Sequence, residues 1–154
     1  ISSRFDFIVV FGYRHLLPKI IIDQYLNKII NLHISYLPWN RGADPNLWSI
    51  IDETPKGVSI HLIDEGIDTG DLLIQKMVSI SPDDTLKSSY DRLIEEISNL
   101  FIESWPSIKT GKLHSKKQKP GGSFHLKKDR LKIEHLLTSG WDTPIKEIML
   151  SKSK

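Results

Sequence analysis

Short apolar runs alternate with helical stretches over residues 1–110 of this 154-residue chain. The runs lie at 5–11, 28–32, 58–62 and 72–78, and they read as strands buried in a sheet. The first run should be buried on both faces. Between the runs, Pro18 and Pro45 each stand where a proline can open a helix. Strands that alternate with helices are typical of a parallel sheet covered by helices, so we expect an α/β fold.

A long helix is expected after Thr85, where several residues can cap its first turn. Pro106 should end or kink this helix near its end. Its apolar side chains recur at spacings of three and four and form one face: Leu86, Tyr90, Leu93, Ile94, Ile97, Phe101 and Trp105. A single apolar face predicts a helix that packs on the sheet, with no functional site implied.

The composition changes at Gly111, where a basic, turn-rich segment begins. We therefore divide the chain into a main domain at 1–110 and, at 111–154, a basic loop with a small extension of one or two short helices. At the other end, the chain starts with Ile1 and enters a strand almost at once. This start suggests a fragment whose upstream part is missing, and the alternative is a processed or tag-cleaved terminus.

The composition excludes several classes of function. The chain has no cysteine, which removes disulfides, zinc thiolate sites and cysteine nucleophiles and suits a cytoplasmic protein. A net charge of +2 is too small to imply a nucleic-acid or membrane partner. His114, His125 and His135 lack metal-ligand spacing, so no metal is expected. No Gly-x-Gly-x-x-Gly motif supports a dinucleotide site.

Asn31 and His33 stand at the end of the second run and are two residues apart. On a strand this spacing points both side chains to the same side. An imidazole moves protons near neutral pH, and an amide N–H stabilises a developing oxyanion, so the pair suits acyl transfer. A carboxylate beside the imidazole would fix its tautomer, and Asp68, in a glycine-flanked loop, is the candidate. The spacing alone leaves a purely structural histidine open. His61 is interpreted as a buried histidine that is either structural or supports the site from behind.

Four blocks in order resemble one family: Asn31-x-His33-x-Ser35-x-Leu37-Pro38, then Arg41-Gly42 with Pro45, then Gly57 to His61, then Asp68-Thr69-Gly70. The chain resembles the formyltransferases that use 10-formyltetrahydrofolate as formyl donor. The resemblance implies a Rossmann-like, mostly parallel sheet that lacks its N-terminal βα units. It covers Phe5 to about Val78 closely and the long helix loosely.

The resemblance also implies roles for individual residues. Asn31 would hold the formyl oxygen, His33 would transfer protons, and Asp68 would pair with His33 or relay a proton through water. The walls of the pterin pocket would come from two loops, at Tyr13, His15, Leu16, Leu17, Ile63, Asp64 and Glu65. Four residues would bind the acceptor and shape the loop that follows Asn31 and His33: Ser35, Trp39, Arg41 and Gly42.

The loop from Tyr36 to Trp48 is most similar to that of bacterial enzymes acting on nucleotide-linked amino sugars, some of which serve O-antigen biosynthesis. The expected acceptor is therefore a dTDP- or GDP-linked 4-amino-4,6-dideoxyhexose. The alternatives are methionyl-tRNA formyltransferase, with a longer basic extension, and a non-catalytic folate- or nucleotide-binding fragment. Folate and the sugar are the expected partners, no membrane or nucleic-acid partner is expected, and a homodimer is left open.

Overall fold

The computed structural model describes residues 5–152, and its main sheet has the strand order β1-β2-β4-β5. These strands are β1 (Ile8–Phe11), β2 (Ile29–His33), β4 (Gly57–Leu62) and β5 (Leu72–Met77). Each of the four expected runs therefore forms a strand, with shifts of up to three residues at its ends. The first four residues, on which the expectation of a missing upstream part depends, lie outside the described residues.

The α/β class is confirmed, but the sheet is mixed. β1 and β2 are parallel and are joined through α1 (Lys19–Gln24), whereas β2/β4 and β4/β5 are antiparallel. This corrects the expectation of a mostly parallel sheet for the described part of the chain. The short loop at 63–71 explains one reversal, because a parallel connection from β4 to β5 would need a crossover of a dozen or more residues.

β1 is an edge strand among the described residues. The prediction that it is buried on both faces is wrong. Ile8 and Val10 are half-buried against α1 and its neighbours, whereas Val9 and Phe11 are exposed. The apolar run is continuous in sequence, yet only one face has a packing partner in the described structure. The pattern of residues could not reveal this, because a run that is apolar on both faces carries no alternation.

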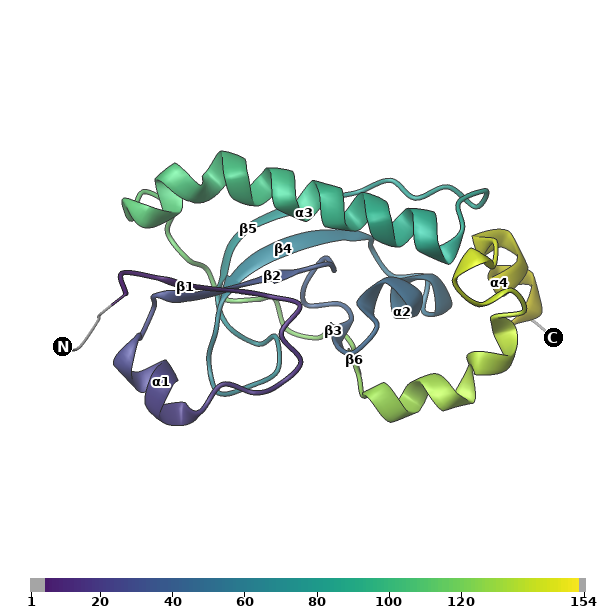
Figure 1. Ribbon diagram of the computed structural model, residues 1–154, viewed down its shortest axis with the longest axis horizontal. Helices are drawn as coiled ribbons and strands as arrows, with labels where there is room; N and C mark the ends of the chain where they lie inside the picture. The colour runs from purple at the N-terminus through teal and green to yellow at the C-terminus, as the bar shows by residue number, and fades with distance from the viewer. Residues whose placement is uncertain (1–4, 153–154) are drawn as a thin grey trace.

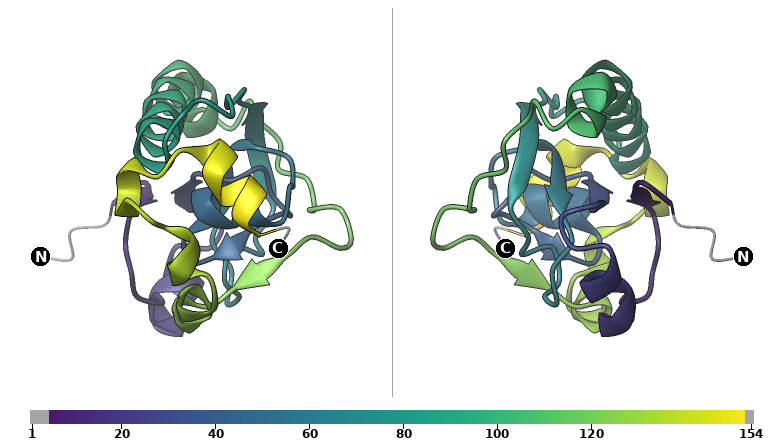
Figure 2. Two further views of the ribbon diagram at one scale, coloured as in Figure 1. Left: turned by 90° about the vertical axis from the view of Figure 1, so that its right-hand side faces the viewer. Right: turned by 90° about the vertical axis from the view of Figure 1, so that its left-hand side faces the viewer.

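The long helix α3 (Leu86–Lys109) lies along one face of the sheet, and α1 lies on the opposite side (Figures 1 and 2). The α3 side chains Leu93, Ile97 and Leu100 pack with Ile30, Val58 and other strand residues in the main core. Pro106 does not end the helix, which continues to Lys109. Burial of Ile108 in the same core explains the extra turn, because its packing offsets the hydrogen bond that proline removes.

Residues 111–152 form the C-terminal extension, which packs against elements of the first 110 residues. β6 (Phe124–His125) pairs in parallel with β3 (Arg41–Gly42), and three short 3₁₀ turns follow at Lys127–Lys132, Glu134–Leu136 and Gly140–Asp142. The final helix α4 (Ile145–Ser151) packs on α2 (Pro45–Ile51). Their shared core contains Leu47, Ile50, Leu86, Ile145 and Ile148. The boundary at residue 111 stays a prediction, and the two parts share apolar packing.

No helix in the described residues is long and apolar enough to cross a membrane.

The packing of α3 on the sheet predicts unequal effects of two isoleucine truncations in this helix. Ile97 is fully buried and Ile102 is 69% exposed. We expect Ile97→Ala to lower the free energy of unfolding by about 2–5 kcal/mol. The matched Ile102→Ala should change it by less than about 0.5 kcal/mol. Urea unfolding followed by circular dichroism measures both, and equal losses would contradict the packing described.

Candidate active site

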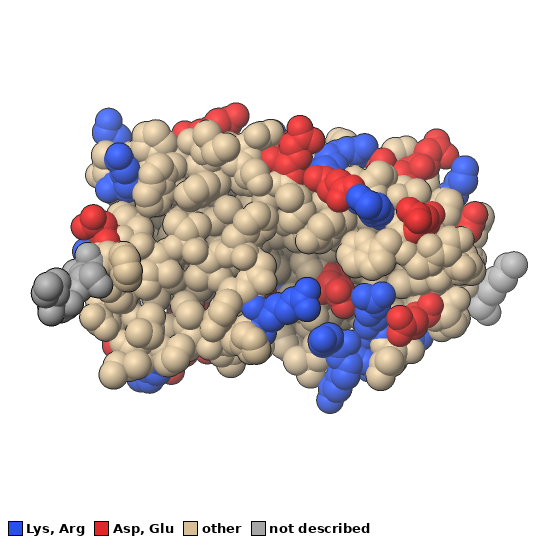
Figure 3. All heavy atoms as spheres, in the orientation of Figure 1, with Lys and Arg blue, Asp and Glu red and all other residues tan. Residues whose placement is uncertain are grey.

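A cavity of about 1250 Å³ opens beside the ends of β1 and β2. Its lining comes from the loop after β1, the polar end of β2, the loop at 63–68, residues 42–47 and the C-terminal extension. The helix α3, for which no site was expected, also contributes Leu86, Tyr90 and Ile94. Figure 3 shows Lys and Arg side chains beside a hollow on this face, and the lining includes Arg14, Lys127 and Arg130. The volume exceeds the roughly 300–1,000 Å³ of a usual small-molecule site, so two reactants can occupy it together.

The strand register brings three polar side chains to this cavity. Asn31 and His33 are two apart on β2, and Asn31 is paired with His61 across the antiparallel β2/β4 ladder. Asn31 Nδ2 lies 3.2 Å from His61 Nε2, and the rings of His33 and His61 meet edge to face at 6.2 Å. All three line the cavity, so the predicted alignment of Asn31 and His33 is confirmed. His61 is buried as expected, and it contacts Asn31 and Asp68.

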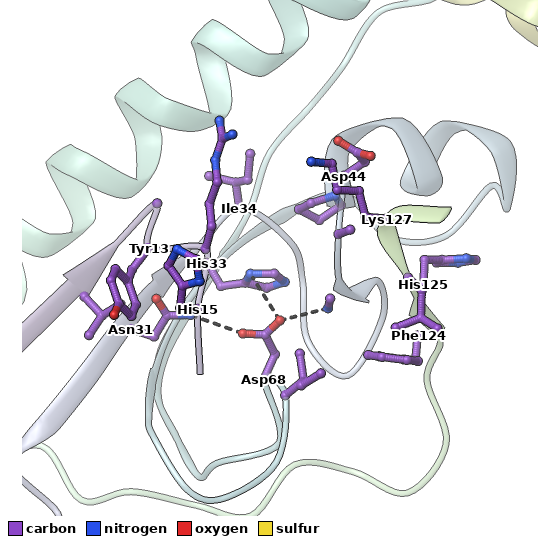
Figure 4. Close-up of a pocket in the computed structure, with 18 of the residues that line it drawn as sticks. Tyr13, His15, Asn31, His33, Ile34, Asp44, Asp68, Phe124, His125 and Lys127 are labelled. Carbon is purple, nitrogen blue, oxygen red and sulfur yellow. Dashed lines mark hydrogen bonds and ion pairs between the residues drawn. The ribbon is translucent and has the colours of Figure 1, made fainter. Parts of the chain in front are cut away.

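The Asp68 carboxylate lies at the centre of this group (Figure 4). Its Oδ1 accepts a hydrogen bond from Asn31 Nδ2 at 3.2 Å and lies 3.5 Å from His61 Nε2. Its Oδ2 accepts one from the Gly42 amide at 2.8 Å and lies 3.8 Å from His33 Nδ1. The Asp68 carboxylate thus contacts both Asn31 and His33.

Backbone features hold this carboxylate in place. Asp68 has a φ of 54°, in the left-handed region that few side chains adopt without support. The Gly42 amide that donates to it belongs to β3, which runs close beside β6. A Cβ on Gly42 would lie 2.3 Å from the His125 carbonyl oxygen, so this close approach requires glycine. The pairing of β3 with the extension therefore sets the position of the donor.

Burial by itself would raise the pKa of the Asp68 carboxyl, because a buried charge loses its hydration. The nearby His33 and His61 rings and the Gly42 N–H act in the opposite direction and prevail, so the pKa is lowered. Asp68 is therefore a carboxylate at neutral pH. A largely buried anion next to two imidazoles is the arrangement that supports proton transfer by histidine.

The tautomer of His33 follows from its backbone contact. Its Nε2 lies 3.1 Å from the Asn40 carbonyl oxygen, which can only accept, so Nε2 carries the hydrogen. In the neutral ring Nδ1 is then the basic atom, and it faces Asp68. Burial lowers the pKa of His33 below the ordinary value of 6.5, although the Asp68 charge opposes the shift. His33 is thus a neutral base at pH 7.

The Asn31 amide is already occupied in this arrangement. Its Nδ2 contacts both Asp68 Oδ1 and His61 Nε2, one for each of its two hydrogens. His61 accepts in this contact, because its Nδ1 donates to the Leu62 carbonyl at 2.7 Å. An oxyanion held by Asn31 would therefore replace one of these two partners. The spacing of Asn31 and His33 in the sequence did not indicate that the amide already has partners.

A buried network fixes Asn40 and, through it, His33. Asn40 is fully buried, and its Nδ2 donates to Thr54 Oγ1 at 2.7 Å. Ser123 Oγ accepts from the Asn40 amide at 2.8 Å and donates to Asn40 Oδ1 at 3.1 Å. The C-terminal extension thus supports the residue whose carbonyl orients the imidazole.

The residues expected to form the pterin pocket all line the cavity: Tyr13, His15, Leu16, Leu17, Ile63, Asp64 and Glu65. They form one side of it, with the Tyr13 and His15 rings in edge contact at 5.5 Å. Their position fits a flat ligand of mixed polarity placed beside Asn31 and His33. Their contact with folate stays a prediction.

Of the four residues expected to bind the acceptor, only Gly42 lines the cavity. Ser35 is buried and donates to the Trp39 carbonyl at 2.8 Å, which shapes the loop after β2. Trp39 is half-buried outside the cavity lining, and Arg41 donates to Gln118. These three residues have structural contacts here. Their positions do not indicate a direct contact with the acceptor.

The extension supplies lining residues that the sequence did not reveal: Phe124, His125, Lys127, Arg130, Leu131, Glu134 and Trp141. His125 stacks on Trp48 with ring centroids 3.9 Å apart, and its Nε2 lies 2.7 Å from Asp52 Oδ2. Among the described residues, no group of histidine, aspartate and glutamate has the geometry to hold a metal ion.

Comparisons with known proteins identify the family of the chain. The family model described as formyl transferase matches residues 2–104. The chain is 36% identical over 140 residues to methionyl-tRNA formyltransferase of Trichlorobacter lovleyi, covering 90% of this chain and 43% of that protein. It is 32% identical to dTDP-4-amino-4,6-dideoxyglucose formyltransferase of Mycobacterium bovis, covering 88% of this chain and 57% of the relative. The chain thus spans about half or less of the length of these relatives.

Among solved structures, the chain is similar to the formyltransferase PseJ from Anoxybacillus kamchatkensis, solved with UDP-4,6-dideoxy-4-formamido-L-AltNAc and tetrahydrofolate. The TM-score is 0.94 at 47% identity, over 99% of this chain and 80% of PseJ. A likely sugar N-formyltransferase from Mycobacterium tuberculosis aligns at 33% identity with a TM-score of 0.78, over 87% of this chain and 56% of that one. The cavity, the Asn31–His33–Asp68 cluster and these matches lead to one conclusion: the chain belongs to the formyl transferase family.

Proposed function

We propose that the protein transfers a formyl group from 10-formyltetrahydrofolate to the primary amine of a nucleotide-linked amino sugar. The observation that carries the proposal is the contact of Asp68 with both Asn31 and His33 inside a cavity large enough for two reactants. Membership of the formyl transferase family supports the reaction class. The similarity to PseJ, which was solved with a formylated sugar nucleotide and tetrahydrofolate, supports the choice of donor and acceptor.

In this reaction the amine nitrogen bonds to the formyl carbon, and the bond from that carbon to N10 of the donor breaks. The amine loses one proton and N10 gains one, so the transfer is balanced. His33 Nδ1 is the basic atom that accepts the proton, and Asp68 stabilises the imidazolium that forms. The same imidazolium then supplies the proton that N10 needs.

Asn31 stabilises the negative charge that develops on the formyl oxygen. The formyl oxygen replaces His61 as the partner of one Nδ2 hydrogen, while the other hydrogen stays bonded to Asp68 and holds the amide in place. Because Gly42 and Asn31 both donate to Asp68, the carboxylate needs no rearrangement for this step. The walls at 13–17 and 63–65 would orient the pterin and exclude water.

The acceptor assignment depends on comparison of two groups of relatives. Similarity to PseJ extends over 99% of this chain at 47% identity, so it includes the extension that lines the cavity. The methionyl-tRNA formyltransferase from Trichlorobacter lovleyi is 36% identical over 90% of the chain. The higher identity, over a larger share of the chain, favours a sugar nucleotide, with a UDP-linked 4-amino-4,6-dideoxy sugar as the first candidate.

His33→Ala should lower kcat by about 10²- to 10⁴-fold, because it removes the base of the reaction. The rate of formylation of the UDP-linked amino sugar, followed by mass spectrometry, measures the effect. His114→Ala is the matched control, since His114 is exposed and lies outside the cavity lining, and it should keep wild-type turnover. Turnover of the His33 variant within tenfold of wild type, at an unchanged melting temperature, would refute the assignment.

The buried state of His33 predicts the acid limb of the pH–rate profile. Burial lowers the pKa of His33 from 6.5, and a base works only when it is neutral, so kcat/KM should fall with a midpoint below pH 6.5. Asp68 raises the pKa of His33, so Asp68→Asn should move the midpoint to still lower pH and reduce the plateau. A midpoint above 6.5, or a shift to higher pH in the variant, would be inconsistent with this role.

A further inference from the structure

Gln118 connects the two backbone segments that hold the Asp68 carboxylate. Its Nε2 donates to the Asp68 carbonyl at 2.7 Å and to the Gly70 carbonyl at 2.9 Å. Its Oε1 accepts from Arg41 Nε at 3.1 Å and from Arg41 Nη2 at 2.7 Å. Arg41 is the neighbour of Gly42, whose amide donates to the Asp68 side chain.

The orientation of the Gln118 amide follows from its partners. A guanidinium can only donate and a carbonyl can only accept, so the oxygen must face Arg41 and the nitrogen must face Asp68 and Gly70. Both amide hydrogens are used, and the oxygen has two donors. Such a bridge has one satisfied arrangement, which makes it a specific link between the loop at 63–71 and β3.

The backbone around Gln118 is also anchored. Two residues earlier, the Lys116 amide donates to the Leu72 carbonyl at 2.9 Å, and the Leu72 amide donates to the Lys116 carbonyl at 2.7 Å. Residues 114–117 and 119–120 are exposed, whereas Gln118 is half-buried. Gln118 therefore turns inward from an otherwise exposed basic segment. It faces the loop at 63–71, which carries Asp68.

We infer that Gln118 is a positioning residue that holds the left-handed Asp68 backbone against Arg41–Gly42, so that the carboxylate stays beside His33 and Asn31. The inference deepens the proposed function, because it assigns a support to the same site. Gln118 lies outside the cavity lining, so it acts through Asp68 and not on the reactants. Without the link, the loop can move away from β3, and a misplacement of about 1 Å can cost about 10²-fold in rate.

The test replaces Gln118 with Met, which keeps the length of the side chain and removes its hydrogen bonds. Gln118→Met should lower kcat by about 10- to 100-fold while KM for 10-formyltetrahydrofolate and for the UDP-linked amino sugar stays within about twofold. The exposed neighbour provides the matched control, and Lys119→Met should behave as wild type. Gln118→Glu keeps the Arg41 contact but places a carboxylate oxygen against two carbonyls, so it should lose activity to the same extent.

An NMR titration of the His33 imidazole adds a readout that does not depend on turnover. The groups that face this ring are Asp68 and His61, and withdrawal of the Asp68 charge should lower the His33 pKa in Gln118→Met. If the wild type shows no formyl transfer, the proposed function fails while the titration still tests the positioning. Unchanged kcat in either Gln118 variant, or an unchanged His33 pKa in Gln118→Met, overturns the inference.

Discussion

A buried carboxylate is the group on which the rest of this site depends. Asp68 is largely removed from water, and its charge is supported by the Gly42 amide, the Asn31 amide and two histidine rings. These groups come from three strands: Asn31 and His33 from β2, Gly42 from β3 and His61 from β4. Removal of an acceptor that satisfies several buried groups costs more than one hydrogen bond, so the charge ties these segments together. The catalytic proposal for His33 and Asn31 follows from this single anion.

The extension beyond residue 110 completes the site as well as the core. Ser123 fixes Asn40, which orients His33, and Gln118 links the Asp68 loop to β3. Phe124 and His125 pair with β3 and line the cavity. Under the proposed function, this segment would therefore form part of the acceptor site.

The sequence predicted the α/β class, the four strands of the main sheet, the long helix and the shared side of Asn31 and His33, because these follow from local periodicity. It did not predict β3, whose two residues are too few for a periodic pattern. It could not predict the antiparallel return of β4, since strand direction depends on connections and not on residue type. From the residues alone Asp68 was only a candidate partner of His33, because 35 residues separate the two and no spacing rule covers that distance. The resemblance then implied the pairing. Gln118 gave no signal, because a glutamine in a basic loop usually faces solvent.

The most direct measurement is the mass gain of candidate acceptors incubated with the protein and 10-formyltetrahydrofolate. The panel should contain UDP-, dTDP- and GDP-linked 4-amino-4,6-dideoxy sugars and methionyl-tRNA. We predict the gain of one formyl group on a nucleotide-linked amino sugar and none on the tRNA. Formylation of methionyl-tRNA alone, or of no acceptor by a folded protein that binds folate, would contradict the account.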